Sequence, residues 1–407
     1  MHRLPHRQTG CPMNSPTRPQ SRIMPRMAFF PRFPRSARSG GADVARRVAH
    51  RLHHDIVAGL AAFAFVLGTL AGESAAQPSA IPDDTLGLAV ALDTLRWQDS
   101  LDLRAEFADY ASMGVRWLRT DLYWASVQAD GPDSYDWRDM DRIIDLAGVF
   151  GIRVLPVVGS TPEWAWQDPE RPSPPRDPQD FGRFLKAAVA RYAPRGIHTW
   201  EIWNEPNLEG PFPPRPDAAA YAALLKEGSA AIRAADPGAT IILGGLAAAT
   251  RTNLWGEPPA IAAVEFLETV YAEGAGDSFD AVAFHPYTGA DLPDLRARGN
   301  SWGLMAGPLR AVMAEHGDEA KAIWITEYGA PTNEANGGVS EARQAELLAA
   351  SVALARETPW LGPLFWYSYR DRGTDPEDRE DWFGLIAGDD RPKPAREVLE
   401  SILSEQP

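Results

Sequence analysis

Two glutamates close two apolar runs of the chain, and their setting suggests acid–base chemistry. Glu205 lies in WEIWNEPN at residues 200–207, and Glu327 lies in WITEYGAPT at residues 324–332. Because Pro206 cannot donate a hydrogen bond to a neighbouring strand, the first run is expected to end where its polar residues begin. Two carboxyl groups can cleave an acetal when one protonates the leaving oxygen and the other, ionised, attacks the carbon. The sequence therefore predicts glycosidic bond hydrolysis if the fold brings the pair together.

The elements that would position this pair form a repeating pattern. From residue 86 the chain alternates short apolar runs with longer amphipathic stretches, which is typical of parallel strands joined by helices. Glycines such as Gly114, Gly151 and Gly196 stand where helices are expected to end. Eight such rounds predict a closed (β/α)8 TIM barrel. The predicted strands cover residues 86–92, 115–119, 152–158, 199–203, 240–243, 281–284, 322–326 and 364–367.

An open doubly wound sheet is the alternative to this barrel. Such a sheet usually carries a glycine-rich phosphate-binding turn after its first strand. Here the corresponding residues are Leu92, Asp93, Thr94 and Leu95, without any glycine. The count of eight strands and the missing turn together favour the barrel.

The predicted strand ends carry polar and aromatic side chains. In a barrel of this class, catalytic groups lie where the strands end at the carboxyl side. Arg119 ends the second predicted strand, and it is a donor that could keep an attacking carboxylate ionised. Flat indole rings suit the C–H faces of sugars, and two candidates, Trp124 and Trp164, follow the second and third strands.

The segments WNEPN and WITEYGAPT resemble the clan A glycoside hydrolases, whose acid/base and nucleophile lie at the ends of strands four and seven. The resemblance covers about residues 84–404 and is closest to family 39, with family 5 as its neighbour. It implies that Glu205 is the acid/base and Glu327 the nucleophile. It further implies a substrate-binding set: Asn204 at the sugar 2-hydroxyl, Arg119 and Tyr287 on either side of the nucleophile, His285 beside them, and Trp366 as the floor of the subsite.

These observations predict a β-glycoside hydrolase that retains anomeric configuration by double displacement. Carboxyl groups about 5 to 5.5 Å apart would support retention, and about 6.5 to 9.5 Å would indicate inversion. One alternative is a carbohydrate-binding barrel without catalysis, which would need the aromatic side chains but not both glutamates. Another is a metal-dependent barrel hydrolase with carboxylate and imidazole ligands, although HxH and HExxH spacings do not occur in the sequence. We expect neither a metal nor another cofactor.

The amino-terminal part of the chain predicts export. Residues 1–55 contain eleven arginines, no lysine and two acidic residues, and residues 56–71 form an uncharged apolar run followed by Ser74, Ala75 and Ala76. Basic, apolar and small residues in this order are typical of a signal peptide. We therefore expect residues 1–76 to be removed near Ala76, leaving residues 77–407 as one secreted or periplasmic catalytic domain. A membrane anchor is the alternative if the apolar run is not cleaved.

The charge of the chain bears on its partners. The net charge is −15 for 407 residues, while residues 1–55 carry +9, so the remainder carries −24, the difference between the two. A strongly acidic surface repels nucleic acid and anionic membranes. The predicted partner is a neutral poly- or oligosaccharide, and the sequence does not identify the sugar, its linkage or the oligomeric state.

Overall fold

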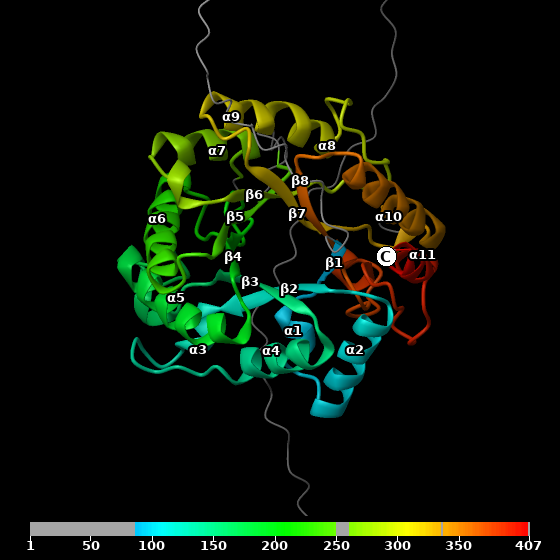
Figure 1. Ribbon diagram of the computed structural model, residues 1–407, viewed down its shortest axis with the longest axis horizontal. Helices are drawn as coiled ribbons and strands as arrows, with labels where there is room; N and C mark the ends of the chain where they lie inside the picture. Colours follow the sequence, from blue (N-terminus) through cyan, green and yellow to red (C-terminus); the bar gives the residue numbers. More distant parts are fainter. Residues whose placement is uncertain (1–85, 250–259, 335–336, 406–407) are drawn as a thin grey trace, which may run out of the picture.

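Eight parallel strands close into a barrel in which each strand pairs with its neighbours in the chain and β8 returns to β1. The computed structural model describes residues 86–249, 260–334 and 337–405 (Figure 1). The barrel predicted from the sequence is confirmed. Its strands are β1 Leu86–Ala89, β2 Trp117–Tyr123, β3 Arg153–Gly159, β4 Thr199–Asn204, β5 Thr240–Ala247, β6 Ala281–His285, β7 Ala322–Tyr328 and β8 Leu361–Tyr367.

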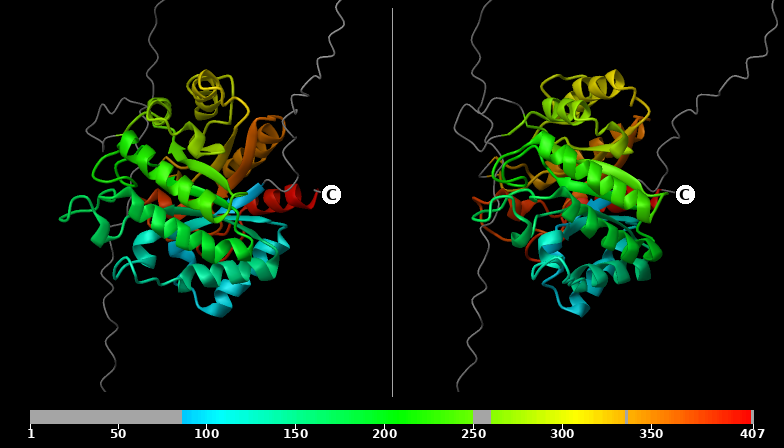
Figure 2. Two further views of the ribbon diagram at one scale, coloured as in Figure 1. Left: turned by 60° about the vertical axis from the view of Figure 1, so that its left-hand side comes forward. Right: turned by 90° about the vertical axis from the view of Figure 1, so that its left-hand side faces the viewer.

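The helices pack around the outside of the strands, as Figure 2 shows from two further sides. Gly114, Gly151 and Gly196 all adopt the left-handed conformation expected where a helix ends. The helices are α1 Leu92–Leu95, α2 Ser100–Ser112, α3 Trp124–Val127, α4 Arg138–Phe150, α5 Pro178–Tyr192, α6 Ala218–Ala235, α7 Ala263–Ala272, α8 Ser301–Leu304, α9 Arg310–Glu315, α10 Glu341–Arg356 and α11 Pro394–Ser404.

Strand boundaries differ from the predictions at several ends. The first strand ends at Ala89 because Leu92 already begins α1. The second strand runs on to Tyr123, which places Arg119 inside the strand and not at its end. The fifth strand continues to Ala247, and the eighth begins at Leu361.

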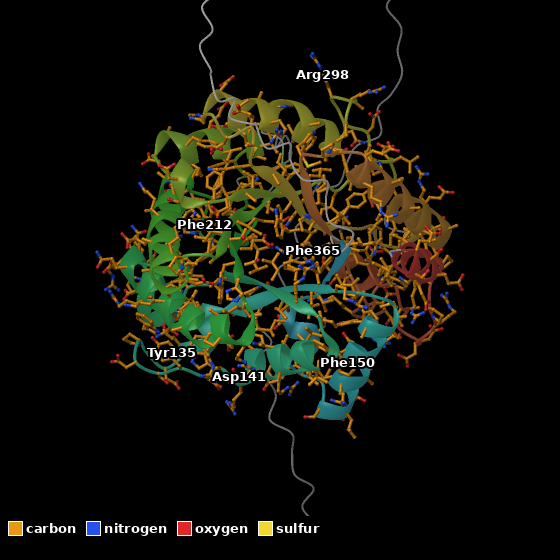
Figure 3. The ribbon with its side chains drawn as sticks, viewed as in Figure 1. Tyr135, Asp141, Phe150, Phe212, Arg298 and Phe365 are labelled. Atoms are coloured by element: carbon orange, nitrogen blue, oxygen red, sulfur yellow. The ribbon has the colours of Figure 1, made fainter. Side chains whose placement is uncertain are left out.

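Alternating side chains divide the core into two layers. The larger cluster fills the space between strands and helices, whereas a smaller one fills the barrel interior. Phe365 belongs to the interior cluster and lies near the centre of the barrel in Figure 3. Trp117 meets the rings of Trp324 and Phe365 edge-on at 6.0 and 6.1 Å between centroids. Since Trp117 begins β2, these rings fill the amino-terminal half of the barrel and leave its carboxyl end for chemistry.

The predicted signal segment, residues 1–76, lies outside the described residues. Within the described ranges, no helix combines the length and the apolar character that crossing a bilayer requires.

Candidate active site

The fold brings the two predicted glutamates to one histidine. Nδ1 of His285 lies 3.0 Å from Oε1 of Glu205 and 3.8 Å from Oε2 of Glu327. The two carboxylate oxygens are therefore separated by no more than the sum of 3.0 and 3.8 Å. This limit is compatible with the spacing of about 5 to 5.5 Å between the carboxyl groups of retaining enzymes.

Glu327 is held by one donor from β2 and another from the segment that follows β6. Nη1 of Arg119 donates to its Oε1 at 2.6 Å, and the hydroxyl of Tyr287 donates to its Oε2 at 3.0 Å. Burial raises the pKa of Glu327, but the electrostatic influence of His285 and Arg119, with the Tyr287 hydrogen bond, more than offsets this. The net result is a pKa below the usual value, which keeps the carboxylate ionised as a nucleophile must be.

Glu201 is a part of the site that the sequence analysis missed. It lies fully buried in β4, where its two oxygens accept hydrogen bonds from Nε and Nη2 of Arg119 at 2.8 and 3.0 Å. Nη2 of Arg119 also donates to Oδ1 of Asn204 at 2.7 Å. Arg119 therefore joins Glu201, Asn204 and Glu327 through one planar guanidinium, whose fork of donors fixes their relative positions.

The end of β4 owes its shape to unusual backbone conformations. Trp203 and Glu205 have φ values of 74° and 43°, in a region that residues other than glycine seldom adopt. Trp203 turns outward, where its Nε1 donates to the carbonyl of Pro211 and its ring packs against Phe212. Glu201 and Asn204 consequently share the inward face, although strict alternation would place them on opposite faces. Strain of this kind is common where a fold aims a functional side chain.

His285 is fixed on both sides of its ring. Its Nε2 lies 3.0 Å from Oγ1 of Thr326, which donates to Glu201 at 3.1 Å. A Cβ atom on Gly245 would collide with the imidazole, so only glycine fits there. Gly245 also accepts a hydrogen bond from the backbone of Glu205 at 2.9 Å. The same residue therefore helps to place both His285 and Glu205.

Two aromatic residues predicted to bind substrate belong to the core. Trp366 is fully buried in the outer layer and meets Tyr328 edge-on, because its neighbours Phe365 and Tyr367 take the inward positions of β8. Trp124 is also fully buried, and its ring stacks on that of Phe184 in α5. The prediction that Trp366 and Trp124 contact the sugar is therefore wrong.

Trp164 remains a candidate for substrate contact. Its ring is partly exposed and packs edge-on against Trp124, and its Nε1 donates to the carbonyl of Gln128 at 2.7 Å. This hydrogen bond fixes the ring at the exit of β3.

The acidic segment after β8, residues 370–382, contains buried charged side chains. Asp381 is buried, and Asp371 pairs with Lys393 at 2.7 Å, with side chains 2% and 1% exposed. Glu380, in a short 3₁₀ turn over Arg379–Trp382, accepts a hydrogen bond from the hydroxyl of Tyr367 at 3.0 Å. The segment therefore folds back onto the carboxyl end of the barrel.

No group of three or more histidine, cysteine, aspartate or glutamate side chains within residues 86–249, 260–334 and 337–405 is arranged to hold a metal ion. The carboxylates near the centre instead bond to arginine, tyrosine or histidine side chains.

A closed parallel barrel that brings a glutamate from each of the fourth and seventh strand ends to one histidine is the arrangement of the clan A glycoside hydrolases. Residues 87–368 match the family described as Cellulase (glycosyl hydrolase family 5). The chain therefore belongs to glycosyl hydrolase family 5, and it is a retaining β-glycoside hydrolase of clan A. No curated protein sequence matches it significantly.

Solved structures share the fold at low sequence identity. A family 39 glycoside hydrolase from Bacteroides cellulosilyticus WH2 matches with a TM-score of 0.62 at 23% identity, over 80% of this chain and 65% of its own. A monomeric β-xylosidase from Caulobacter crescentus CB15 matches with 0.59 at 22%, over 79% and 68%. GH5_18 from Streptomyces cattleya in complex with GlcNAc matches with 0.60 at 18%, over 80% of both chains. The chain thus spans about two thirds of the first two structures. Families 39 and 5, both expected from the sequence, are both represented.

Proposed function

We propose that this glycoside hydrolase is exported and cleaves β-linkages in a neutral poly- or oligosaccharide, with Glu327 as nucleophile and Glu205 as acid/base. The observation that carries the proposal is the convergence of both carboxylates on Nδ1 of His285. Family membership supports the reaction class, while the residue roles rest on this geometry.

The reaction proceeds in two displacements. In the first, a carboxylate oxygen of Glu327 bonds to the anomeric carbon while the C–O bond to the leaving group breaks and protonated Glu205 gives its proton to that oxygen. In the second, Glu205 as carboxylate takes a proton from water, whose oxygen bonds to the anomeric carbon as the ester to Glu327 breaks. Two inversions return the original configuration.

The surrounding residues orient these groups. Arg119 and Tyr287 each donate to a different oxygen of Glu327, so the carboxylate is fixed and ionised before substrate arrives. Arg119 donates to Oδ1 of Asn204. The NH2 group of the same amide can then donate to a sugar hydroxyl. Preset donors of this type need little reorganisation during the reaction.

The charge of the chain supports a neutral substrate. Excluding residues 1–55, the protein is strongly acidic and repels polyanions at long range. The arginine nearest the reaction centre is already bonded to three carboxylate or amide groups, so it does not offer a site for an acidic sugar.

Substitution of each glutamate, followed by addition of azide, tests the residue roles. Glu327→Ala should lose nearly all turnover of an aryl β-glycoside and, with azide as replacement nucleophile, yield the glycosyl azide of inverted configuration. Glu205→Ala should still form the glycosyl-enzyme from an activated substrate, so azide should yield the azide of retained configuration. Glu163→Ala, an exposed glutamate on the same side of the barrel, is the matched control. Full turnover by either variant would remove the mechanism.

Export is tested separately by amino-terminal sequencing of protein recovered from cells. A mature terminus near Gln77 outside the cytoplasm is expected if residues 1–76 are a cleaved signal. An intact apolar segment in the membrane fraction would instead identify an anchored protein.

A further inference from the structure

Three polar side chains at the exit of β8 form a cluster beside the nucleophile. The hydroxyl of Tyr367 donates to Oε2 of Glu380 at 3.0 Å and accepts from Nη1 of Arg372 at 3.1 Å. The same nitrogen lies 3.9 Å from Oε2 of Glu380. We refer to Tyr367, Arg372 and Glu380 as the β8 cluster. Neither Arg372 nor Glu380 has a part in the two displacements.

Glu380 contains an oxygen without a hydrogen-bond partner. Its Oε1 is buried, yet the structure gives it no donor, while Oε2 is bonded to Tyr367. Buried polar atoms are nearly always paired, because an unpaired acceptor loses its interaction with water and gains nothing in return. The arrangement suggests that this oxygen receives its donor from a ligand.

The β8 cluster lies next to Glu327. Phe383 packs against both Tyr367 and Tyr287, at 5.1 and 6.0 Å between ring centroids, and Tyr287 bonds to Glu327. Burial raises the pKa of Glu380, and the negative charge of Glu327 raises it further, whereas Tyr367 and two arginines lower it. In the register of β7 and β8, Tyr328 is paired with Trp366, so Glu327 directly precedes and Tyr367 directly follows paired residues on adjacent strands.

The position of β8 in the barrel decides which part of a sugar it faces. In the closed order of eight strands, β8 stands opposite β4, which carries Asn204 and leads to Glu205 (Figure 1). Glu205 protonates the leaving group, so that group and the anomeric carbon lie toward β4. The β8 cluster therefore faces the part of the ring farthest from the bond that is cleaved.

We propose that Glu380 and Arg372 bind two adjacent hydroxyl groups, at C3 and C4 of the sugar being transferred, and so determine which sugars are accepted. One hydroxyl donates to Oε1 of Glu380, and the other accepts from the guanidinium of Arg372. A carboxylate and a guanidinium side by side offer one acceptor and several donors, which match a vicinal diol. The proposal rests on the proposed function and narrows its substrate class to sugars with both hydroxyls free.

The segment that carries Glu380 is anchored before substrate binds. Nζ of Lys393 donates to Oδ1 of Asp371 at 2.7 Å and to Oγ1 of Thr332 at 2.9 Å. The same Asp371 oxygen accepts from the backbone of Gly384 at 2.8 Å. These bonds flank Glu380 on both sides in the chain, so its carboxylate is held in place and little ordering is needed on binding.

The test compares kcat/KM for aryl β-glycosides that lack the hydroxyl at C3, C4 or C6. With the native protein, removal of the hydroxyl that meets Glu380 should reduce kcat/KM by about 10- to 100-fold, because a hydrogen bond to a carboxylate is lost. Glu380→Gln should lose a similar factor on the parent glycoside and become nearly insensitive to the same deletion. Glu377→Gln, an exposed carboxylate in the same segment, should behave as the native protein.

Several outcomes would overturn the proposal. If removal of each hydroxyl changed kcat/KM by the same factor in the native protein and in Glu380→Gln, Glu380 would not contact the sugar. That pattern is expected if Glu380 has only a structural role. Faster turnover of a 4-amino-4-deoxy glycoside than of the parent glycoside would show that the β8 cluster selects a basic sugar and not a pair of hydroxyl groups. If Glu327→Ala is inactive while Glu380→Gln shows no selective loss, only this inference fails. If Glu205→Ala and Glu327→Ala retain full turnover, the proposed function itself fails.

Discussion

Replacement of Tyr287 by phenylalanine isolates the contribution of one hydrogen bond to the nucleophile. The hydroxyl donates to Oε2 of Glu327 at 3.0 Å. Its loss leaves the hydrogen bond from Arg119 to Oε1 of this carboxylate in place. A hydrogen bond to a charged group contributes about 1.5 to 3 kcal/mol. Because this bond favours the ionised form, its removal should raise the pKa of Glu327 toward the usual value.

The sign of the pH effect follows from the need for an ionised nucleophile. Activity is lost as pH falls through the pKa of Glu327, so the acidic limb of the kcat/KM profile should move to higher pH in Tyr287→Phe. On that limb the loss should reach about 10- to 100-fold, the rate equivalent of the hydrogen bond, and it should be smaller on the plateau. An aryl β-glycoside assayed across the acidic range measures the shift.

A matched control separates this effect from general destabilisation. Tyr271→Phe also removes a tyrosine hydrogen bond to a carboxylate, that to Asp318 at 2.8 Å, but on α7 outside the barrel. It should lower stability without moving the acidic limb. An unshifted limb in Tyr287→Phe, with melting temperatures similar in both variants, would refute the reasoning.

Three further perturbations probe the support of the site. Glu201→Gln breaks the buried pair with Arg119 and should lower the free energy of unfolding by about 3 to 5 kcal/mol, as read from denaturant titration; a change below about 1 kcal/mol would contradict the pairing. Gly245→Ala should displace the imidazole of His285 and reduce kcat by at least about 10²-fold, whereas unchanged turnover would show that the imidazole position is not critical. Lys393→Met leaves Asp371 buried without its cation and should lower the free energy of unfolding by about 3 to 5 kcal/mol. If the broken pair is the cause, the double variant Lys393→Met/Asp371→Leu should recover most of this loss.

Periodicity and strand-end chemistry were sufficient to predict the barrel and the paired glutamates. Continuous apolar runs at regular intervals encode parallel strands covered on both faces, and closure of eight such strands fixes where their carboxyl ends meet. Glu205 and Glu327 follow from that rule alone. Their position relative to His285, in contrast, depends on backbone detail that periodicity does not carry.

Glu201 is a functional residue that the strand-end rule does not find, because it lies inside β4. A charged residue inside an apolar strand is a signal that could have revealed it, since buried carboxylates need a partner and Arg119 was already a candidate. Strict alternation, however, places Asn204 on the face opposite to Glu201. The left-handed backbone of Trp203 reverses this relation, and a propensity scale gives no warning of positive φ at a tryptophan.

The aromatic predictions failed for a simpler reason. Trp366 was chosen because the family resemblance suggested it, although the two-residue period of β8 assigns the inward positions to Phe365 and Tyr367. The folding of the acidic segment onto the barrel could not be predicted from the sequence, because its partners, such as Lys393, lie outside the acidic run itself. Local composition cannot identify a counter-charge supplied by another element.

The ammonium of Lys393 gives the last helix an influence on substrate preference. This side chain stands at the start of α11, yet it fixes the segment that presents Glu380 to the sugar. Directed evolution aimed at a new specificity would usually randomise only the loops at the barrel mouth. Libraries for this protein should also include residues 391–395, because repositioning this anchor offers a way to retune recognition while the hydrolytic centre stays intact.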